Sequence, residues 1–327
     1  MKHSVSSFVL TSFFISLSST ATAAVDATST LVNVDIDPDL LTEVQLALPE
    51  STIVNQDFLD DSYNPNITLQ TDAHIAITFL DEGAGYRNSL GYFTFSDTTF
   101  DGYTFGDLDT DNSGHIGISE LQNLSGIETG MVFNNSSEAG GGGSLLTGDT
   151  VTLGGASITN VSGTEFDMTG GTLFEEGTNV GFFLLQNAWD GSQVKGWDYT
   201  SSDPLAMYTV DFLNPENSAS ATIDNADDYS RHVAMMTSLA GENEVILGFE
   251  DLVRPGGDND FNDAVFRVRT DPVTALFADV PTTETVISLQ AAPAPEIGGL
   301  SGLISMAFGS LLFWRRKSAH SKKRSTS

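Results

Sequence analysis

The chain has 327 residues, of which 40% are hydrophobic, which is enough for a buried core in one large domain or two smaller ones. Its formal net charge is -31, from 44 acidic and 13 basic residues, and so negative a field repels nucleic-acid phosphates and anionic lipid heads. The absence of cysteine excludes disulfides, zinc–thiolate sites and thiol nucleophiles. We therefore expect cations, and no nucleic acid, as partners.

Residues 1–24 have the layout of a secretory signal peptide. Lys2 precedes the apolar run Phe8–Leu17, and the small-residue stretch STATAA follows. A positive residue, an apolar run and small residues in this order predict export, with cleavage near Ala23 or Ala24. The apolar run is short for the alternative, a membrane anchor.

The body of the chain alternates short apolar stretches with turns rich in Gly, Asn, Asp and Ser. This spacing is typical of all-β proteins, and we expect a jelly-roll-like β-sandwich at residues 73–272, after an N-terminal segment at 25–72. A spacer at 273–296 follows. Strands are predicted for these apolar runs: HIAITFL (with Ile75, Ile77 and Phe79 on one face), GYFTF, DTVTL, GFFLLQ, AMYTVDFL, HVAMMTSL, EVILGF and AVFRVR.

Two segments have helical spacing instead. In DPDLLTEVQLAL, a single stripe contains Leu40, Leu41, Val44 and Leu48, which predicts a short helix in the N-terminal segment. The second helical segment, SELQNLSGI, begins at the end of the motif described next.

The stretch DTDNSGHIGISE has the spacing of an EF-hand calcium loop. Such a loop needs oxygen ligands at its first, third, fifth and twelfth positions, a glycine at the sixth, a backbone carbonyl at the seventh and a branched apolar residue at the eighth. No other register of the sequence fits. Calcium is therefore predicted here, with a solvated acidic loop as the alternative. The residues in these roles are Asp109, Asp111, Ser113, Glu120, Gly114, His115 and Ile116.

The calcium loop occurs once, within an insertion at residues 101–130. The segment that enters it contains Gly102 and Gly106, which disfavour a helix. A regulatory EF-hand opens a pair of helices, so we expect a static calcium clip rather than a switch. Because the backbone carbonyl of His115 is the expected ligand, its imidazole is expected to point to solvent.

The stretch FEDLVRPGGDNDFNDAVF provides a second candidate calcium site. In an extended segment, oxygen-bearing residues spaced by two share one face, while Phe261 between them points into a core. Acidic residues of the preceding strand would complete the site. The expected ligands are Asp258, Asp260, Asn262, Glu250 and Asp251.

This second segment has an equally specific alternative, a structural hydrogen-bond hub. In that arrangement the carboxylates accept turn N–H groups and pair with Arg254 or Arg231. The sequence leaves both interpretations open.

Aromatic residues cluster in AWDGSQVKGWDYT, a turn-rich segment between predicted strands. If Trp189, Trp197 and Tyr199 were exposed on one face, they would form a platform for a sugar ring. Aromatic residues in a β-sandwich usually belong to the core, which is the alternative.

The sequence lacks the motifs of common catalytic classes: it contains no Gly-x-Ser-x-Gly, His-Glu-x-x-His or phosphate loop. No catalysis is therefore expected. A glycosidase with two carboxylates would need a pair facing each other across a cleft, which a sequence does not reveal.

Four segments of the body form a set: FLDEGAGYRNSLGYFTF, VGFFLLQNAW, RHVAMM and LGFEDLVRPGGDNDFNDAVFRV. They resemble successive blocks of a bacterial family, the domain of unknown function 4114 (DUF4114). The resemblance covers residues 73–272, and the last block is its most specific part. It implies a secreted β-sandwich of surface and matrix proteins, with no established activity.

At the C-terminal end, APAPE leads into the apolar segment Ile297–Trp314, which is long enough for a membrane helix, and a basic tail follows. With this order of features, residues 297–327 resemble a PEP-CTERM sorting signal. The resemblance implies that an exosortase-like protease removes this tail. Because Pro295-Glu296 is followed by Ile297 instead of the usual proline, a retained single-pass anchor is the alternative.

These patterns together predict an exported, calcium-binding structural or adhesive protein of the cell surface or extracellular matrix. Expected partners are calcium, polysaccharide or surface proteins, and the sorting protease. The alternative function is a carbohydrate-binding module that acts on exopolysaccharide.

Overall fold

The computed structural model describes residues 31–60, 64–162, 165–197, 204–219, 221, 229–238 and 241–276. The predicted signal peptide at 1–24 and the predicted sorting segment at 297–327, with its apolar helix at 297–314, lie outside these ranges. Within them, no helix is both long and apolar enough to cross a membrane.

Most of the regular structure is β-strand, which confirms the predicted all-β class. The helices are short: α1 (Pro38–Ala47), α2 (Phe105–Leu108) and α3 (Ile118–Gln122). The strands are β1 (Val32–Asn33), β2 (Ile67–Thr68), β3 (His74–Asp81), β4 (Ser89–Phe95), β5 (Glu128–Phe133), β6 (Asp149–Thr152), β7 (Ser157–Ser162), β8 (Glu165–Thr169), β9 (Asn179–Leu185), β10 (Ala206–Tyr208), β11 (Val233–Ser238), β12 (Gly241–Phe249) and β13 (Ala264–Asp271).

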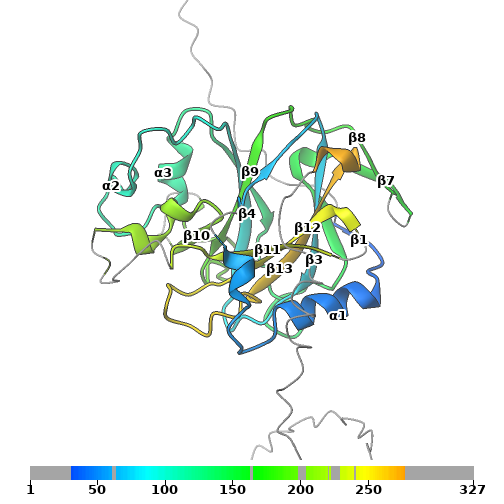
Figure 1. The fold of residues 1–327 in the computed structure, drawn as a ribbon, viewed down its shortest axis with the longest axis horizontal. Coiled ribbons are helices and arrows are strands. Elements are labelled where there is room, and N and C mark those ends of the chain that lie inside the picture. The colour runs from blue at the N-terminus through cyan, green and yellow to red at the C-terminus, as the bar shows by residue number, and fades with distance from the viewer. Residues whose placement is uncertain are drawn as a thin grey trace, which may run out of the picture. The chain divides into compact units, whose positions relative to one another are not determined.

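The strands form two antiparallel sheets and a hairpin (Figure 1). The six-stranded sheet has the order β1-β6-β3-β13-β12-β11, and the other has the order β10-β9-β4-β5, with β2 paired to β9. The hairpin consists of β7 and β8. Neighbours such as β3 and β13 are far apart in sequence, so the fold depends on long-range pairing.

The main core contains residues of both sheets. Ile75, Ile77 and Phe79 of β3 belong to one buried cluster with Phe182 of the second sheet. The ring of Phe182 lies 5.1 Å from that of Phe266 in β13. The predicted inward face of HIAITFL is therefore confirmed.

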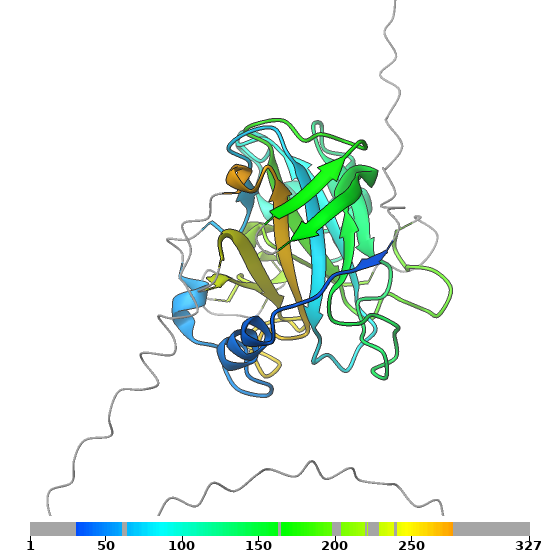
Figure 2. The same cartoon turned by 90° about the vertical axis from the view of Figure 1, so that its right-hand side faces the viewer.

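The outer face of the six-stranded sheet is covered by α1 and by the β7–β8 hairpin (Figure 2). Leu40 and Val44 of α1 pack against Leu80 of β3, and Phe166 of the hairpin packs against Ala76. The helix starts as its sequence indicates, because Asp37 caps the N–H of Asp39 at 2.9 Å and Pro38 occupies the first turn.

One strand prediction is wrong in its length. In AMYTVDFL only Ala206–Tyr208 form a strand, and Asp211–Leu213 form a 3-10 turn. The side chain of Asn214 accepts a hydrogen bond from Tyr208 N at 2.7 Å and donates one to Tyr208 O at 2.9 Å. These contacts satisfy the backbone groups of Tyr208 locally, so the strand ends there.

Candidate metal centres

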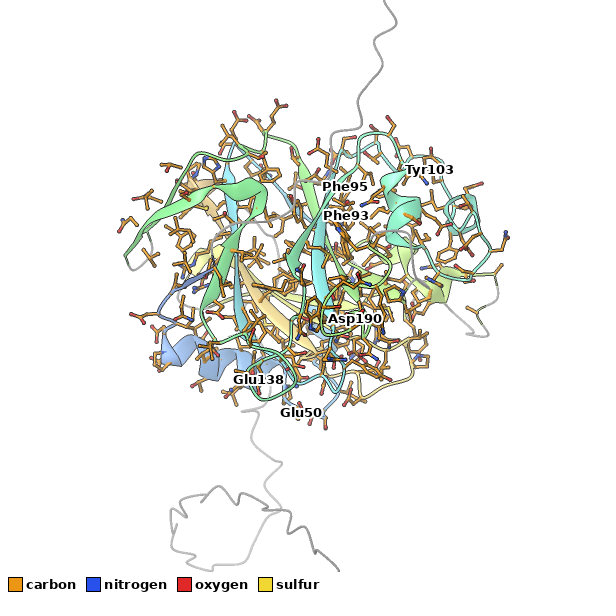
Figure 3. All side chains as sticks on the ribbon, turned by 180° about the vertical axis from the view of Figure 1, so that it is seen from behind. Glu50, Phe93, Phe95, Tyr103, Glu138 and Asp190 are labelled. Atoms are coloured by element: carbon orange, nitrogen blue, oxygen red, sulfur yellow. The ribbon has the colours of Figure 1, made fainter. Side chains whose placement is uncertain are left out.

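The predicted calcium loop lies in the connection between β4 and β5 and is anchored on the outer face of the second sheet. Ile116, Ile118 and Leu121 are buried in one cluster with Phe93 of β4. Tyr208 of β10 donates its hydroxyl to Ile116 O at 2.7 Å. Figure 3 shows Phe93 and Phe95 along β4. The loop is thus fixed to the sheet through its eighth position, which the motif reserves for an apolar residue.

The helices that flank the loop are short, α2 with four residues and α3 with five. The sequence predicted a disfavoured entering helix because of Gly102 and Gly106, and α2 is indeed a single turn after Gly102. Helices of this length do not form the opening pair of a sensor hand.

The loop brings its predicted ligands together. Carboxylate oxygens of Asp109, Asp111 and Glu120 lie within 4.8 Å of one another. Ser113 N donates to both aspartates at 2.9 Å, and Ser113 Oγ donates to His115 O at 2.9 Å. The three carboxylates expected to coordinate calcium therefore converge, and Ser113 Oγ lies beside them, 3.4 Å from Asp109 Oδ1.

Backbone groups of the loop hold Glu120 in place. Thr110 N and Gly117 N donate to its two carboxylate oxygens at 2.6 and 2.9 Å. Gly114, at the sixth position, has a φ of 88°, which only glycine adopts readily. Calcium binds oxygens at about 2.3–2.6 Å, so two of its ligands lie at most about 5 Å apart. The residues present fit a calcium ion.

The second candidate segment is not extended, contrary to the expectation from its sequence. Asn259 and Phe261 have φ angles of 57° and 60°, and β13 begins only at Ala264. Side chains alternate between two faces only along an extended strand, so the predicted shared face does not form here. Phe261 is nevertheless fully buried, as predicted.

The five predicted ligands of this segment do not form one group. Asp258 and Asp260 lie with Glu50, which follows α1, and we call these three residues the outer triad. The amide of Asn262 donates to Glu50 Oε2 at 3.0 Å and so adjoins the outer triad.

Glu250 and Asp251 lie instead with Asp263, which the sequence does not predict as a ligand, and we call these three residues the inner triad. The carboxylate oxygens of the inner triad lie within 4.8 Å of one another, and all three residues are buried.

The alternative of a hydrogen-bond hub is partly realised. Ser51 N donates to Asp260 Oδ2 at 2.7 Å, and Asp251 N donates to Asp263 Oδ2 at 2.8 Å. The arginines bind elsewhere: Arg254 donates to Arg231 O at 2.8 Å, and Arg231 pairs with Asp211 at 2.9 Å. The expected pairing of these arginines with the cluster is absent from the ion pairs of the described residues.

Burial raises the pKa values of several acidic residues in and near the inner triad. Burial, with the negative charge of Asp258 nearby, raises the pKa of Glu250 to about 8. Burial, with Asp251 nearby, raises the pKa of Asp263 to about 9. Glu82, at the end of β3, has its pKa raised to about 7 by burial and by acidic neighbours that include Glu138. Crowded, desolvated carboxyl groups of this kind are stabilised as anions by a bound cation.

These pKa values predict how the calcium-free protein responds to pH. Its free energy of unfolding should fall as pH rises from about 5 to about 9, because raised carboxyl pKa values mean that the folded state binds more protons than the unfolded state. The stability present at low pH is lost as pH rises through the folded pKa values. Urea unfolding in chelator measures this. Constant or rising stability over the same interval would contradict it.

The tryptophan segment packs against the core. Trp189 and Trp197 are half-buried beside the cluster that anchors the calcium loop, and the ring of Trp197 stacks on Phe183 with centroids 6.3 Å apart. Tyr199 lies outside the described residues. These two rings do not favour the sugar platform.

Residues 174–271 match the model of a known family. The match is to a domain of unknown function (DUF4114). It covers less than a third of the chain and contains β9 to β13, with the inner triad, Asp258 and Asp260. The calcium loop, Glu50 and the block FLDEGAGYRNSLGYFTF precede it. Neither the curated proteins nor the solved structures contain a match.

The sequence does not predict that Glu50, Glu82 and Asp263 lie close to the other acidic residues of the two triads. Figure 3 shows Glu50 and Glu138 at the same end of the molecule, and Glu138 N donates to Glu82 Oε2 at 3.2 Å. The only sequence signal was for Asp263, whose position directly before a predicted strand places it opposite the end of the preceding strand.

Proposed function

We propose that this protein is an exported, calcium-binding structural or adhesive protein of the cell surface or extracellular matrix, which acts without catalysis. Its two sheets would form a jelly-roll-like β-sandwich. The observation that carries the proposal is the convergence of carboxylate oxygens of Asp109, Asp111 and Glu120 within 4.8 Å of one another. The other two expected ligands, Ser113 and His115, lie in the same loop, where Ser113 Oγ donates to His115 O at 2.9 Å.

Calcium would stabilise this loop by offsetting the mutual repulsion of its carboxylates. The net charge of -31 favours cation binding over any anionic partner. For an extracellular module a Kd of roughly 0.1–1 mM is ordinary. Free calcium at about 100 times the Kd adds about 2.7 kcal/mol to the free energy of unfolding. Magnesium, which requires a smaller and nearly octahedral site, fits a flexible loop with a bidentate glutamate less well.

The structural role follows from how the loop is anchored. Leu121 of α3 is fully buried, and the backbone oxygen of Ile116 accepts a hydrogen bond from the Tyr208 hydroxyl. An ion in the loop would therefore fasten the insertion to the second sheet. Such a fastener strengthens a domain that lacks disulfides.

Export rests on the sequence alone. The signal-peptide layout at 1–24 and the PEP-CTERM-like tail at 297–327 support secretion, followed by removal of the tail by an exosortase-like protease. Surface proteins or matrix polysaccharide are the corresponding partners.

A thermal melt of the full chain with calcium, with magnesium and with chelator tests the proposal. Calcium should raise the Tm of the wild type, magnesium should raise it less, and Glu120→Gln should lose part of the calcium-dependent shift. Glu175→Gln, which alters an exposed carboxylate in a turn, is the matched control and should keep the full shift. A Glu120→Gln shift equal to that of wild type would refute calcium binding in the loop.

A further inference from the structure

We propose that the inner triad, Glu250, Asp251 and Asp263, holds a buried calcium ion of its own, separate from the Asp109–Glu120 loop and from the outer triad. A calcium ion at this site would deepen the proposed function, on which the site rests for its structural role. The observations that support the site concern residues outside the Asp109–Glu120 loop.

The pairing of two strands builds the inner triad. In the antiparallel ladder of β12 and β13, Phe249 faces Ala264 as the last pair. Glu250 follows the first strand and Asp263 precedes the second, so the register places them opposite each other. Asp263 N donates to Phe249 O at 3.0 Å, and Asp251 N donates to Asp263 Oδ2 at 2.8 Å. The 4.8 Å limit on the carboxylate oxygens fits ligands of one calcium ion, which lie at most about 5 Å apart.

One carboxylate oxygen of the inner triad is buried without a partner. The exposed fraction is 0% for Glu250, 3% for Asp251 and 9% for Asp263. Glu250 Oε1 accepts a hydrogen bond from Leu252 N at 3.3 Å, but Glu250 Oε2 has no hydrogen-bond partner among the residues that the structure describes. Leaving such an acceptor unsatisfied is costly. A cation beside it removes that cost.

No basic side chain neutralises the inner triad within the described ranges. The four ion pairs found there use other acids. Arg254, which is close enough to feel the charge of Glu250, directs its guanidinium to Asn259 Oδ1 at 2.9 Å and to Arg231 O at 2.8 Å. Among the described residues, the three buried acids therefore form no ion pair with a basic side chain.

The donor set selects calcium. It consists of carboxylate oxygens alone, which suits hard cations. His232 is not available as a ligand, because its Nδ1 contacts Glu250 O at 3.0 Å and its Nε2 contacts Glu216 at 2.9 Å. Magnesium usually retains several waters, which a buried triad cannot accommodate, so calcium is the better fit.

An ion at the inner triad would connect the two sheets. Asn88, directly before β4, donates to Asp251 Oδ2 at 2.6 Å and accepts from Asn187 N at 2.9 Å. Gln186, directly after β9, donates to Asp251 O at 2.7 Å. Asp251 thus already links the β12–β13 connection of one sheet to strand ends of the other, and a cation would strengthen that link.

Calcium bound per chain, measured by equilibrium dialysis of the full protein, tests this site. We expect Glu250→Gln to bind one equivalent fewer than wild type, Glu120→Gln to lose a different equivalent, and the double variant to lose both. The control Glu175→Gln should bind as wild type does. If Glu250→Gln binds as many ions as wild type, the inner site is refuted, whatever Glu120→Gln shows. If Glu120→Gln retains the wild-type count while Glu250→Gln binds one ion fewer, calcium binding in the loop is refuted and the inner site stands.

A melt in chelator distinguishes a metal ligand from a structural acceptor. Without calcium, Glu250→Gln should melt at or above the wild-type Tm, because the neutral amide keeps an acceptor for Leu252 N and removes negative charge beside Asp251 and Asp263. A Glu250→Gln protein that melts clearly below wild type in chelator, or does not fold, would assign Glu250 a structural hydrogen-bonding role and overturn the proposal.

Discussion

Replacing Phe93 with alanine is expected to lower the free energy of unfolding by about 3–5 kcal/mol, the usual cost for a buried phenylalanine. Phe93 is fully buried at the centre of the cluster that anchors the calcium loop, with ring centroids 5.3 Å from Phe95 and 6.1 Å from Tyr208. A Cβ on Gly181 would lie only 2.3 Å from the Phe93 ring, so the neighbouring strand has no side chain to fill the cavity. Because Ile116 and Ile118 share this cluster, calcium binding by the loop should weaken as well.

The control for Phe93 lies two residues further along the same strand. Phe95 is only half-buried, so Phe95→Ala should cost clearly less in urea unfolding measured with excess calcium and with chelator. Equal losses for the two variants would show that the cluster is not centred on Phe93. A Phe93→Ala chain with unchanged calcium affinity would show that the cluster does not support the loop.

Replacing Glu216 with leucine is the second change with a large expected effect, a loss of about 2–6 kcal/mol from two buried donors at about 1–3 kcal/mol each. Glu216 Oε1 accepts from Arg254 N at 2.7 Å and contacts His232 Nε2 at 2.9 Å. The Glu216 and His232 side chains are both fully buried. Leucine would leave both donors unpaired beside the connection between β12 and β13, which contains the inner triad.

The conservative change Glu216→Gln keeps a carbonyl acceptor in this position. It should therefore cost less than Glu216→Leu in the same unfolding measurement. If the two variants lose the same free energy, or if Glu216→Leu is neutral, the buried donors are satisfied in another way and Glu216 does not support this part of the fold.

The strands, α1 and the convergence of the loop carboxylates could be predicted because their signals are local. The period of two in HIAITFL and the helical stripe of Leu40 and Val44 each depend on neighbours in sequence, and both are confirmed. All expected ligands of the calcium loop lie within twelve consecutive residues, so the spacing alone predicts that they converge.

The two acidic triads could not be predicted in the same way. Glu50 reaches Asp260 only through the packing of α1, and Asp263 reaches Glu250 only through the register of β12 with β13. No glycine marks the left-handed backbone at Asn259 and Phe261, so the local pattern predicts an extended segment there. Long-range packing and register, which local patterns do not encode, determine these sites.

Equilibrium dialysis of the wild-type protein tests calcium binding most directly. At about 10 mM free calcium, above the roughly 0.1–1 mM Kd ordinary for extracellular modules, the full chain should retain at least two calcium ions, one in the loop and one at the inner triad. A chain that retains no calcium under this condition, and whose Tm is the same in calcium and in chelator, would contradict the account.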